Sequence, residues 1–221
     1  MKKITGVLLS TVLITVLLAG CSSSKADTNT ITLEKNGKIT EQIAEEFAED
    51  YYDESELKEY IEEEVEAYTS ENGKSSVKMS GFDVDEGIAY LTMKYADADT
   101  YAAFKNVEFF RGTILEAQSA GYSFDDISFL AVGDSDAADD ADSGSLSEES
   151  AETTAAEADP DTVLEDDQNT VVILREAVTV VVPGTVLYVS ADGTEVTEDD
   201  TVVITADEDT GVVPEVYIIY E

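Results

Sequence analysis

Carboxylates are by far the most abundant side chains in this sequence that can do chemistry. The chain of 221 residues has 50 Asp and Glu, 12 Lys and Arg, one Cys and no His. Ser-His-Asp and Cys-His nucleophiles, and zinc sites built on His and Cys, are therefore excluded. Two carboxylates about 5 to 9 Å apart can still hydrolyse a glycosidic bond. Acid-only chemistry on glycans therefore stays open as an enzymatic alternative.

Calcium is the second use that carboxylates suggest, because this cation prefers oxygen ligands. Three segments read D-x-D-x-G: 83–87, 140–144 and 207–211. An EF-hand loop instead needs Gly at position six and Glu at position twelve. Position twelve is Lys94, Ala151 and Ile218 in the three segments. Turn chemistry and acidic composition explain these segments, so we expect weak, nonspecific cation binding and no dedicated metal site.

Other ligand classes receive little support from the sequence. No phosphate-binding glycine loop occurs, so no nucleotide cofactor is expected. A formal net charge of −38 makes nucleic acid an improbable partner, since phosphate binding depends on clustered Lys and Arg. Most of the 11 Tyr and 7 Phe stand at core spacing, and Trp is absent. Phe82, Tyr122 and Tyr188 lie near predicted turns and are the candidates for an exposed aromatic surface.

The N-terminus has the layout of a secretory signal. Lys2 and Lys3 precede an uncharged stretch over residues 4–18, which small residues follow. This stretch is shorter than the ~20 residues that a helix needs to span a bilayer. The alternative, an uncleaved membrane anchor with an incidental Cys, is less consistent with the small residues at its end. We expect residues 1–20 to be a signal peptide.

Leu18-Ala19-Gly20-Cys21 follows this stretch and resembles the lipobox of bacterial lipoproteins. The resemblance covers residues 1–21 only and implies cleavage after Gly20 and a diacylglycerol thioether on the Cys21 sulfur. It places the protein on the extracytoplasmic face of the cell membrane, with the lipid on Cys21 as its link to the bilayer. Two acyl chains hold a protein stably, whereas one holds it marginally.

Residues 21–29 would then be a short polar tether to a mixed α+β domain over residues 30–130. Alternating apolar residues predict strands in this domain over 30–34, over a hairpin at 77–95 with a bulge at Gly81, and over 127–130. Apolar spacing and capping residues predict four helices, beginning at Thr40, Asp53, Asp97 or Asp99, and Thr113. For the first of these helices, the expected apolar stripe is Ile43, Phe47 and Tyr51.

Residues 131–168 change in character and are predicted to be a disordered acidic linker. Between Asp134 and Asp167 there are 14 acids and no Lys or Arg. Such a segment buries too little apolar surface to offset the entropy of the chain. Residues 169–221 follow with β-branched runs that predict about five strands. This small all-β domain is marginal alone, so we expect it to pack against the first domain or to pair strands with it.

These features together predict a lipid-anchored α+β protein of the bacterial cell envelope. We expect a non-catalytic binding or envelope-interaction module, with an envelope protein or a glycan as its possible partner. The competing class is a carboxylate-only enzyme that acts on extracellular glycans. The acids are spread over the whole exported chain, which favours solubility at an external membrane surface over one localised acidic site.

Overall fold

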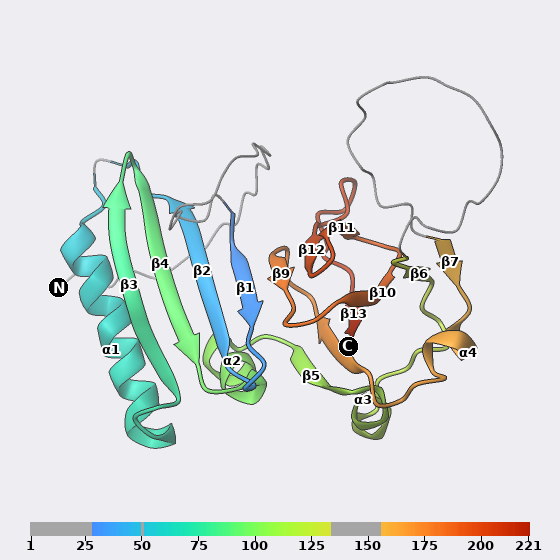
Figure 1. The fold of residues 1–221 in the computed structure, drawn as a ribbon. Coiled ribbons are helices and arrows are strands. Elements are labelled where there is room, and N and C mark those ends of the chain that lie inside the picture. The colour runs from blue at the N-terminus through green and yellow to red at the C-terminus, as the bar shows by residue number, and fades with distance from the viewer. Residues whose placement is uncertain (1–27, 50, 134–155) are drawn as a thin grey trace.

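Two β-sheets and four helices form the fold of residues 28–49, 51–133 and 156–221, which the computed structural model describes (Figure 1). One sheet, called sheet A, consists of β1 (Thr30–Leu33), β2 (Ile39–Glu46), β3 (Val77–Asp85), β4 (Ile88–Tyr95), β9 (Thr179–Val181), β11 (Thr194–Glu198) and β12 (Thr201–Ile204). Its strand order is β11-β12-β9-β1-β2-β4-β3. All pairings in it are antiparallel except that between β1 and β9.

The second sheet, sheet B, consists of β5 (Phe109–Thr113), β6 (Phe129–Ala131), β7 (Ala156–Ala158), β8 (Thr170–Leu174), β10 (Val186–Ser190) and β13 (Val216–Tyr220). Its order is β5-β8-β13-β10-β6-β7, and every pairing is antiparallel. The α+β class expected from the sequence is therefore confirmed at this coarse level.

Local capping signals place three of the helices as predicted. The helices are α1 (Glu54–Asn72), α2 (Ala98–Lys105), α3 (Ile114–Ala120) and α4 (Pro160–Val163). The Asp53 and Asp97 side chains accept backbone N–H groups at the starts of α1 and α2, and Thr113 forms a capping box with Glu116. The hairpin over 77–95 is also confirmed, with its register shift between Met79 and Gly81.

The predicted helix beginning at Thr40 is wrong, because these residues form β2. Ile39, Glu41 and Ile43 point to one face of sheet A, while Thr40 and Gln42 point to the other. The i, i+4 spacing of Ile43 and Phe47 suggested a helix, but pairing with β1 and β4 on both sides of β2 satisfies its backbone along the ladder. Tertiary pairing thus overrides the local pattern.

Each of the two sheets combines strands from the predicted α+β domain with strands from residues 169–221. In sheet A, Thr30 of β1 pairs with Thr179 of β9, and in sheet B β5 pairs with β8 along its whole length. Residues 169–221 supply six strands instead of about five. Residues 169–221 therefore form no separate sheet. The sequence left open whether they pack against residues 30–130 or pair strands with them, and the structure shows strand pairing.

The last part of the predicted linker is ordered, which corrects the prediction for residues 156–168. They form β7 and α4. Val163 at the end of α4 is only 1% exposed and packs on the face of sheet B that points away from sheet A. Val163 and Leu164 supply apolar contacts that the acidic composition of the segment obscured. Residues 134–155 lie outside the described part of the chain.

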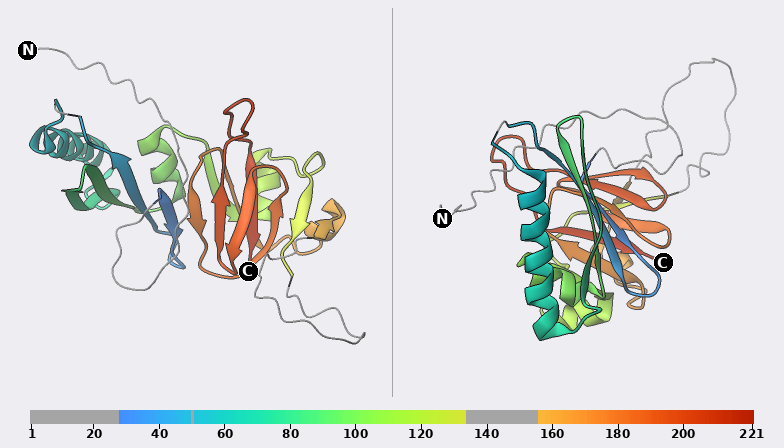
Figure 2. Two further views of the ribbon diagram at one scale, coloured as in Figure 1. Left: turned by 90° about the horizontal axis from the view of Figure 1, so that it is seen from above. Right: turned by 90° about the vertical axis from the view of Figure 1, so that its left-hand side faces the viewer.

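The main hydrophobic core lies where sheets A and B face each other. Ile31, Ile39 and Val180 from sheet A meet Val172 and Ile218 from sheet B in this core. Helices α1 and α2 contribute partly buried side chains to the same core, and in both views of Figure 2 they lie on one side of sheet A. A second core fills the other face of sheet B, under α3 and α4. The opposite face of sheet A is left without a covering helix or strand among the described residues.

Candidate functional site

A buried carboxylate is the most unusual chemical group in the described part of the chain. Glu41 lies in the middle of β2 at an inward position between Ile39 and Ile43, and it is only 3% exposed. A buried charge is costly unless it is paired and hydrogen-bonded. The surroundings of Glu41 therefore show how this cost is offset.

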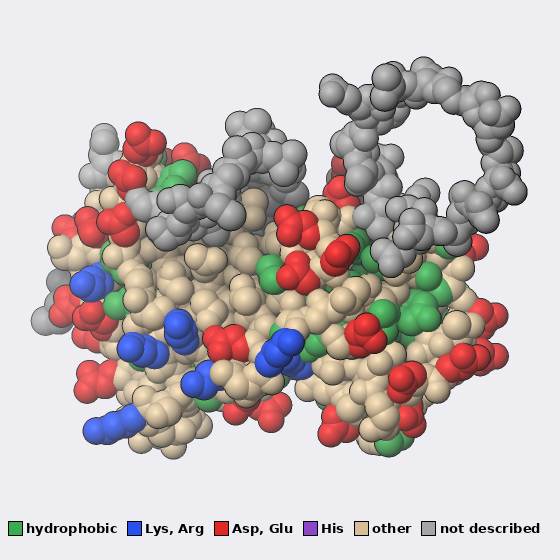
Figure 3. Space-filling view, viewed as in Figure 1, with side chains coloured by type: hydrophobic (Ala, Val, Ile, Leu, Met, Phe, Trp, Pro, Cys, Tyr) green, Lys and Arg blue, Asp and Glu red, His purple; other side chains and the backbone are tan. Residues whose placement is uncertain are grey.

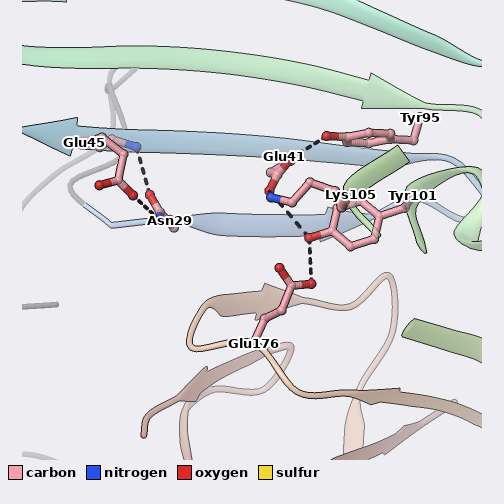
Figure 4. A network of polar contacts seen from close by, with 8 residues as sticks. Asn29, Glu41, Glu45, Tyr95, Tyr101, Lys105 and Glu176 are labelled. Carbon is pink, nitrogen blue, oxygen red and sulfur yellow. Dashed lines mark hydrogen bonds and ion pairs between the residues drawn. The ribbon is translucent and has the colours of Figure 1, made fainter. Parts of the chain in front are cut away.

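Three side chains from other elements converge on Glu41 (Figure 4). The Lys105 Nζ atom at the end of α2 donates to Glu41 Oε1 at 2.5 Å. The Tyr95 hydroxyl on β4 donates to Glu41 Oε2 at 2.6 Å. The Tyr101 hydroxyl on α2 lies 3.5 Å from Glu41 Oε1, and its ring packs edge-on against that of Tyr95. Together these groups form a compact charged network that joins β2, β4 and α2.

A second carboxylate reaches the same network from the chain beyond residue 156. Glu176 lies between β8 and β9, and its Oε1 accepts the Tyr101 hydroxyl at 3.0 Å. Since a tyrosine hydroxyl carries one proton, this shorter bond is the one that Tyr101 donates. The network thereby connects sheet A to the connection that leaves sheet B (Figure 4).

Burial changes the protonation behaviour of these groups. The pKa of Glu176 is raised above its ordinary value, chiefly by burial and further by the charge of Glu41, although Lys105 and the Tyr101 hydrogen bond lower it. The pKa values of Tyr95 and Tyr101 are also raised, first by burial and then by the charge of Glu41. Both tyrosines therefore stay protonated and act as hydrogen-bond donors at neutral pH.

We expect Lys105→Met to lower the free energy of unfolding by about 2 to 3 kcal/mol. The substitution leaves Glu41 buried without its cation, and breaking a buried ion pair typically costs somewhat more than this. The Lys105 side chain is 27% exposed, which reduces the cost through solvent screening. Urea unfolding measures the difference. Lys58→Met on exposed α1 is the matched control and should stay within about 0.5 kcal/mol of wild type; equal losses in both variants would contradict the role of the pair.

The raised pKa of Glu176 gives a pH dependence with a defined sign. The folded state holds the Glu176 proton at a pH where the unfolded chain has lost it, so the contribution to stability is present in acid and is lost as pH rises through the raised pKa. Glu176→Gln is therefore expected to raise the melting temperature at about pH 7.5 and to have little effect near pH 4. Glu195→Gln on exposed β11 controls for the removal of one negative charge. Equal gains at both pH values, or from both variants, would contradict this prediction.

The geometry of Glu41 and Glu176 bears on the catalytic alternative. Tyr101 bridges the two carboxylates, so their separation is of the order that glycoside hydrolysis requires. However, Glu41 is buried and the bridging hydroxyl occupies the space between the acids. Neither acid lines the two best-formed hollows of the described surface. The network joins sheet A to the connection between β8 and β9 through polar contacts.

The sequence-predicted site residues are distributed as follows. Leu18, Ala19, Gly20 and Cys21 lie outside the described residues. Of the aromatic candidates, Phe82, Tyr122 and Tyr188 are all partly buried, and Tyr122 and Tyr188 pack against the outer core of sheet B. They form no common surface.

A different aromatic group is exposed at the end of β2. Phe47 stacks on Tyr52 with ring centroids 4.8 Å apart, and Tyr51 meets Tyr52 edge-on. Tyr51 is 76% exposed, so its predicted place in the apolar stripe of a core helix is wrong. The reason is that the chain leaves sheet A after β2 and turns outward before α1.

The two described D-x-D-x-G segments are turns. Residues 83–87 cover the end of β3 and the turn to β4, with Gly87 at φ +81°. In the other segment Asp207 Oδ1 accepts the Thr210 backbone N–H at 2.8 Å and its hydroxyl at 2.7 Å. Among the described residues no group of three or more Asp, Glu, Cys or His is arranged to hold a metal ion. The segment 140–144 lies outside them.

No described helix is both long and apolar enough to cross a membrane. Comparison with protein families, with curated proteins and with solved structures found no match to this chain. Its function must therefore be argued from its own residues.

Sequence reasoning missed the Glu41 network, although one feature pointed to it. Once β2 is recognised as a strand, Glu41 stands at an inward position between two isoleucines, and an acid there requires a buried partner. The partners Lys105 and Glu176 come from distant parts of the chain, and no local pattern identifies them.

Proposed function

We propose that this protein is a lipid-anchored, extracytoplasmic lipoprotein that acts as a non-catalytic binding module of the bacterial envelope. The anchor is argued from the sequence, in which a short uncharged stretch ends in Leu18-Ala19-Gly20-Cys21. The binding role is argued from a surface of sheet A that the described fold leaves open. This surface is the observation that carries the proposal.

The open face of sheet A is made of polar rows that run across its strands. Thr30, Gln42 and Thr92 lie side by side on β1, β2 and β4, and Thr32, Thr40 and Lys94 form the next row. The opposite side of these strands contributes to the main core, under α1, α2 and sheet B. A regular, flat and polar surface of this kind suits an elongated partner that contacts several strands.

A shallow hollow of about 180 Å³ lies on this open face beside the bulge in β3. Gln42, Tyr90 and Thr92 contribute polar groups to its lining, and Gly81 leaves room at its edge. Asp83 also lines the hollow. Hydrogen-bonding groups around a shallow surface of this kind fit recognition of a partner.

The alternative, a carboxylate-only enzyme acting on extracellular glycans, rests on Glu41 and Glu176. These acids have a suitable separation, but Glu41 is buried and the Tyr101 hydroxyl lies between the two carboxylates. We therefore favour the binding module. If Glu41→Gln and Glu176→Gln each abolished a glycan-hydrolysing activity of the purified protein while leaving it folded, the enzymatic alternative would replace it.

Photo-cross-linking in intact cells tests the proposed binding face. A photoreactive phenylalanine analogue at Thr92 should give a covalent adduct with an envelope component, because Thr92 lines the hollow on the open face. The same analogue at exposed Thr162 on α4 is the matched control. Adducts of the same size and yield from both positions, or none from Thr92, would contradict binding at this face.

A further inference from the structure

The scarce basic residues of this acidic chain gather at one end of the open face of sheet A. Five exposed lysines lie at this end of sheet A: Lys35 and Lys38 in the β1–β2 turn, Lys74 before β3, Lys78 in β3 and Lys94 in β4. Lys74 and Lys78 also line a hollow with Glu62 and Glu66 of α1, so the group extends around the β3 edge of the sheet. In Figure 3 blue side chains gather over the lower part of this face, whereas red ones dominate elsewhere. We call these five residues the lysine end.

Strand register sets two of these lysines directly against each other. Lys94 on β4 has Lys78 on β3 as its cross-strand partner on one side. Its partner on the other side is Thr40 on β2. Lys38 precedes Thr40 by two residues, so it lies toward the same face, one row further along. Like charges directly opposite on a sheet destabilise it. The chain has 50 acids and only 12 basic residues, yet two of its lysines stand directly opposite each other.

The positive charge of the lysine end is not neutralised within the described structure. None of its five lysines forms an ion pair with a carboxylate among the described residues. The nearest acid of the turn, Glu34, instead accepts hydrogen bonds from Asn36 and the Thr40 hydroxyl. The lysine charges therefore remain available to an external anion.

A partly buried arginine, Arg111, adds to this positive region. Arg111 Nη2 donates to the Glu34 backbone carbonyl at 3.0 Å, directly beneath the β1–β2 turn, and its Nε donates to the Tyr220 hydroxyl. Its Nη1 is buried and has no hydrogen-bond partner among the described residues. The guanidinium thus contributes charge without a paired acid.

From this arrangement we propose that the lysine end binds a linear, phosphate-bearing polyanion. Lys is a compact point charge well suited to phosphate, and several neighbouring lysines match repeated anionic groups along a chain. The location of this polymer in the cell envelope rests on the proposed function. The lysine surface that would bind it is argued independently of that function.

A thin polymer fits this surface better than a flat anionic membrane does. A polymer can follow the lysines, whereas a plane also brings the many surrounding acids within the Debye length of about 8 Å. Helix α1 alone carries eight Glu. Asn29, near the start of the described chain, lies at the other end of the strands, where its Nδ2 donates to Glu45 Oε1 at 3.0 Å.

Binding of labelled inorganic polyphosphate to the full-length protein in neutral detergent tests the proposal. Wild type is expected to bind, with an affinity that falls as salt rises. The double variant Lys78→Gln/Lys94→Gln should bind at least tenfold more weakly and show a shallower salt dependence. Its melting temperature should equal or exceed that of wild type, because a like-charge pair is removed. Lys58→Gln, which removes an exposed lysine of α1, is the matched control and should change affinity less than twofold.

Three results would overturn the proposal: no polyphosphate binding by wild type, equal losses in Lys58→Gln and the double variant, or equally tight binding of polyglutamate. Lysine-dependent binding to phosphatidylglycerol vesicles without polyphosphate binding would assign the surface to a membrane instead. None of these outcomes alters the Cys21-dependent localisation, so a failure here is distinguishable from a failure of the lipoprotein proposal.

Discussion

A chain that ends at Pro214 is expected not to fold. The truncation removes β13, which lies between β8 and β10 in sheet B and pairs with both. All five of its residues are buried, and they contribute to the cores on both faces of the sheet. Loss of a strand from the middle of a sheet leaves two edges and two open cores. Burial of its five side chains alone contributes about 7 to 15 kcal/mol, which matches the 5 to 15 kcal/mol by which proteins are typically stable.

Circular dichroism and limited proteolysis measure this effect. The control is a chain that ends at Tyr220 and lacks only Glu221, whose backbone N–H donates to the Thr185 carbonyl; it should remain folded with a small loss of stability. Tyr217→Phe is a second control, since it removes only the hydroxyl that donates to the Ser123 carbonyl at 3.0 Å and should cost about 1 kcal/mol. A cooperative unfolding transition in the Pro214 truncation would contradict the placement of β13.

Cys21→Ala is expected to abolish attachment of the protein to membranes. The variant lacks the only thiol of the chain, so no diacylglycerol thioether can form. Two acyl chains stabilise attachment by ~0.8 kcal/mol per buried methylene, and no electrostatic attraction replaces them. If Lys2 and Lys3 are removed with the proposed signal peptide, 10 basic side chains stand against 50 acidic ones. The variant should appear in the medium or accumulate as uncleaved precursor.

Cell fractionation and incorporation of a labelled fatty acid measure this outcome. Ser22→Ala is the matched control, because it changes the neighbouring residue and keeps the thiol; it should be labelled and remain in the membrane fraction. If the Cys21→Ala protein is processed to the mature size and stays in the membrane fraction, the lipoprotein proposal is wrong.

The parts of the fold that depend on neighbouring residues could be predicted from sequence. Asp53 and Thr113 cap helices through their own side chains, and Gly81 marks a bulge inside a hairpin whose two strands are adjacent in the chain. Each of these features is complete within a short segment. Local chemistry therefore determines them without help from the rest of the molecule.

The parts that depend on distant residues could not be predicted in this way. β2 was expected to be a helix because its apolar spacing is ambiguous, and only its pairing with β1 and β4 decides the matter. The Glu41 network needs Lys105 and Glu176, and the parallel pairing of β1 with β9 needs Thr179. The lysine end likewise becomes visible only when strand register brings Lys78 beside Lys94.

The pairing of Thr30 with Thr179 also makes folding depend on residues far apart in the sequence. β1 pairs locally with β2, but its other partner is β9, and β13 lies between β8 and β10 in sheet B. Contacts between such distant segments form slowly. We therefore expect unfolded protein to refold more slowly than a protein of the same size whose contacts are mostly local.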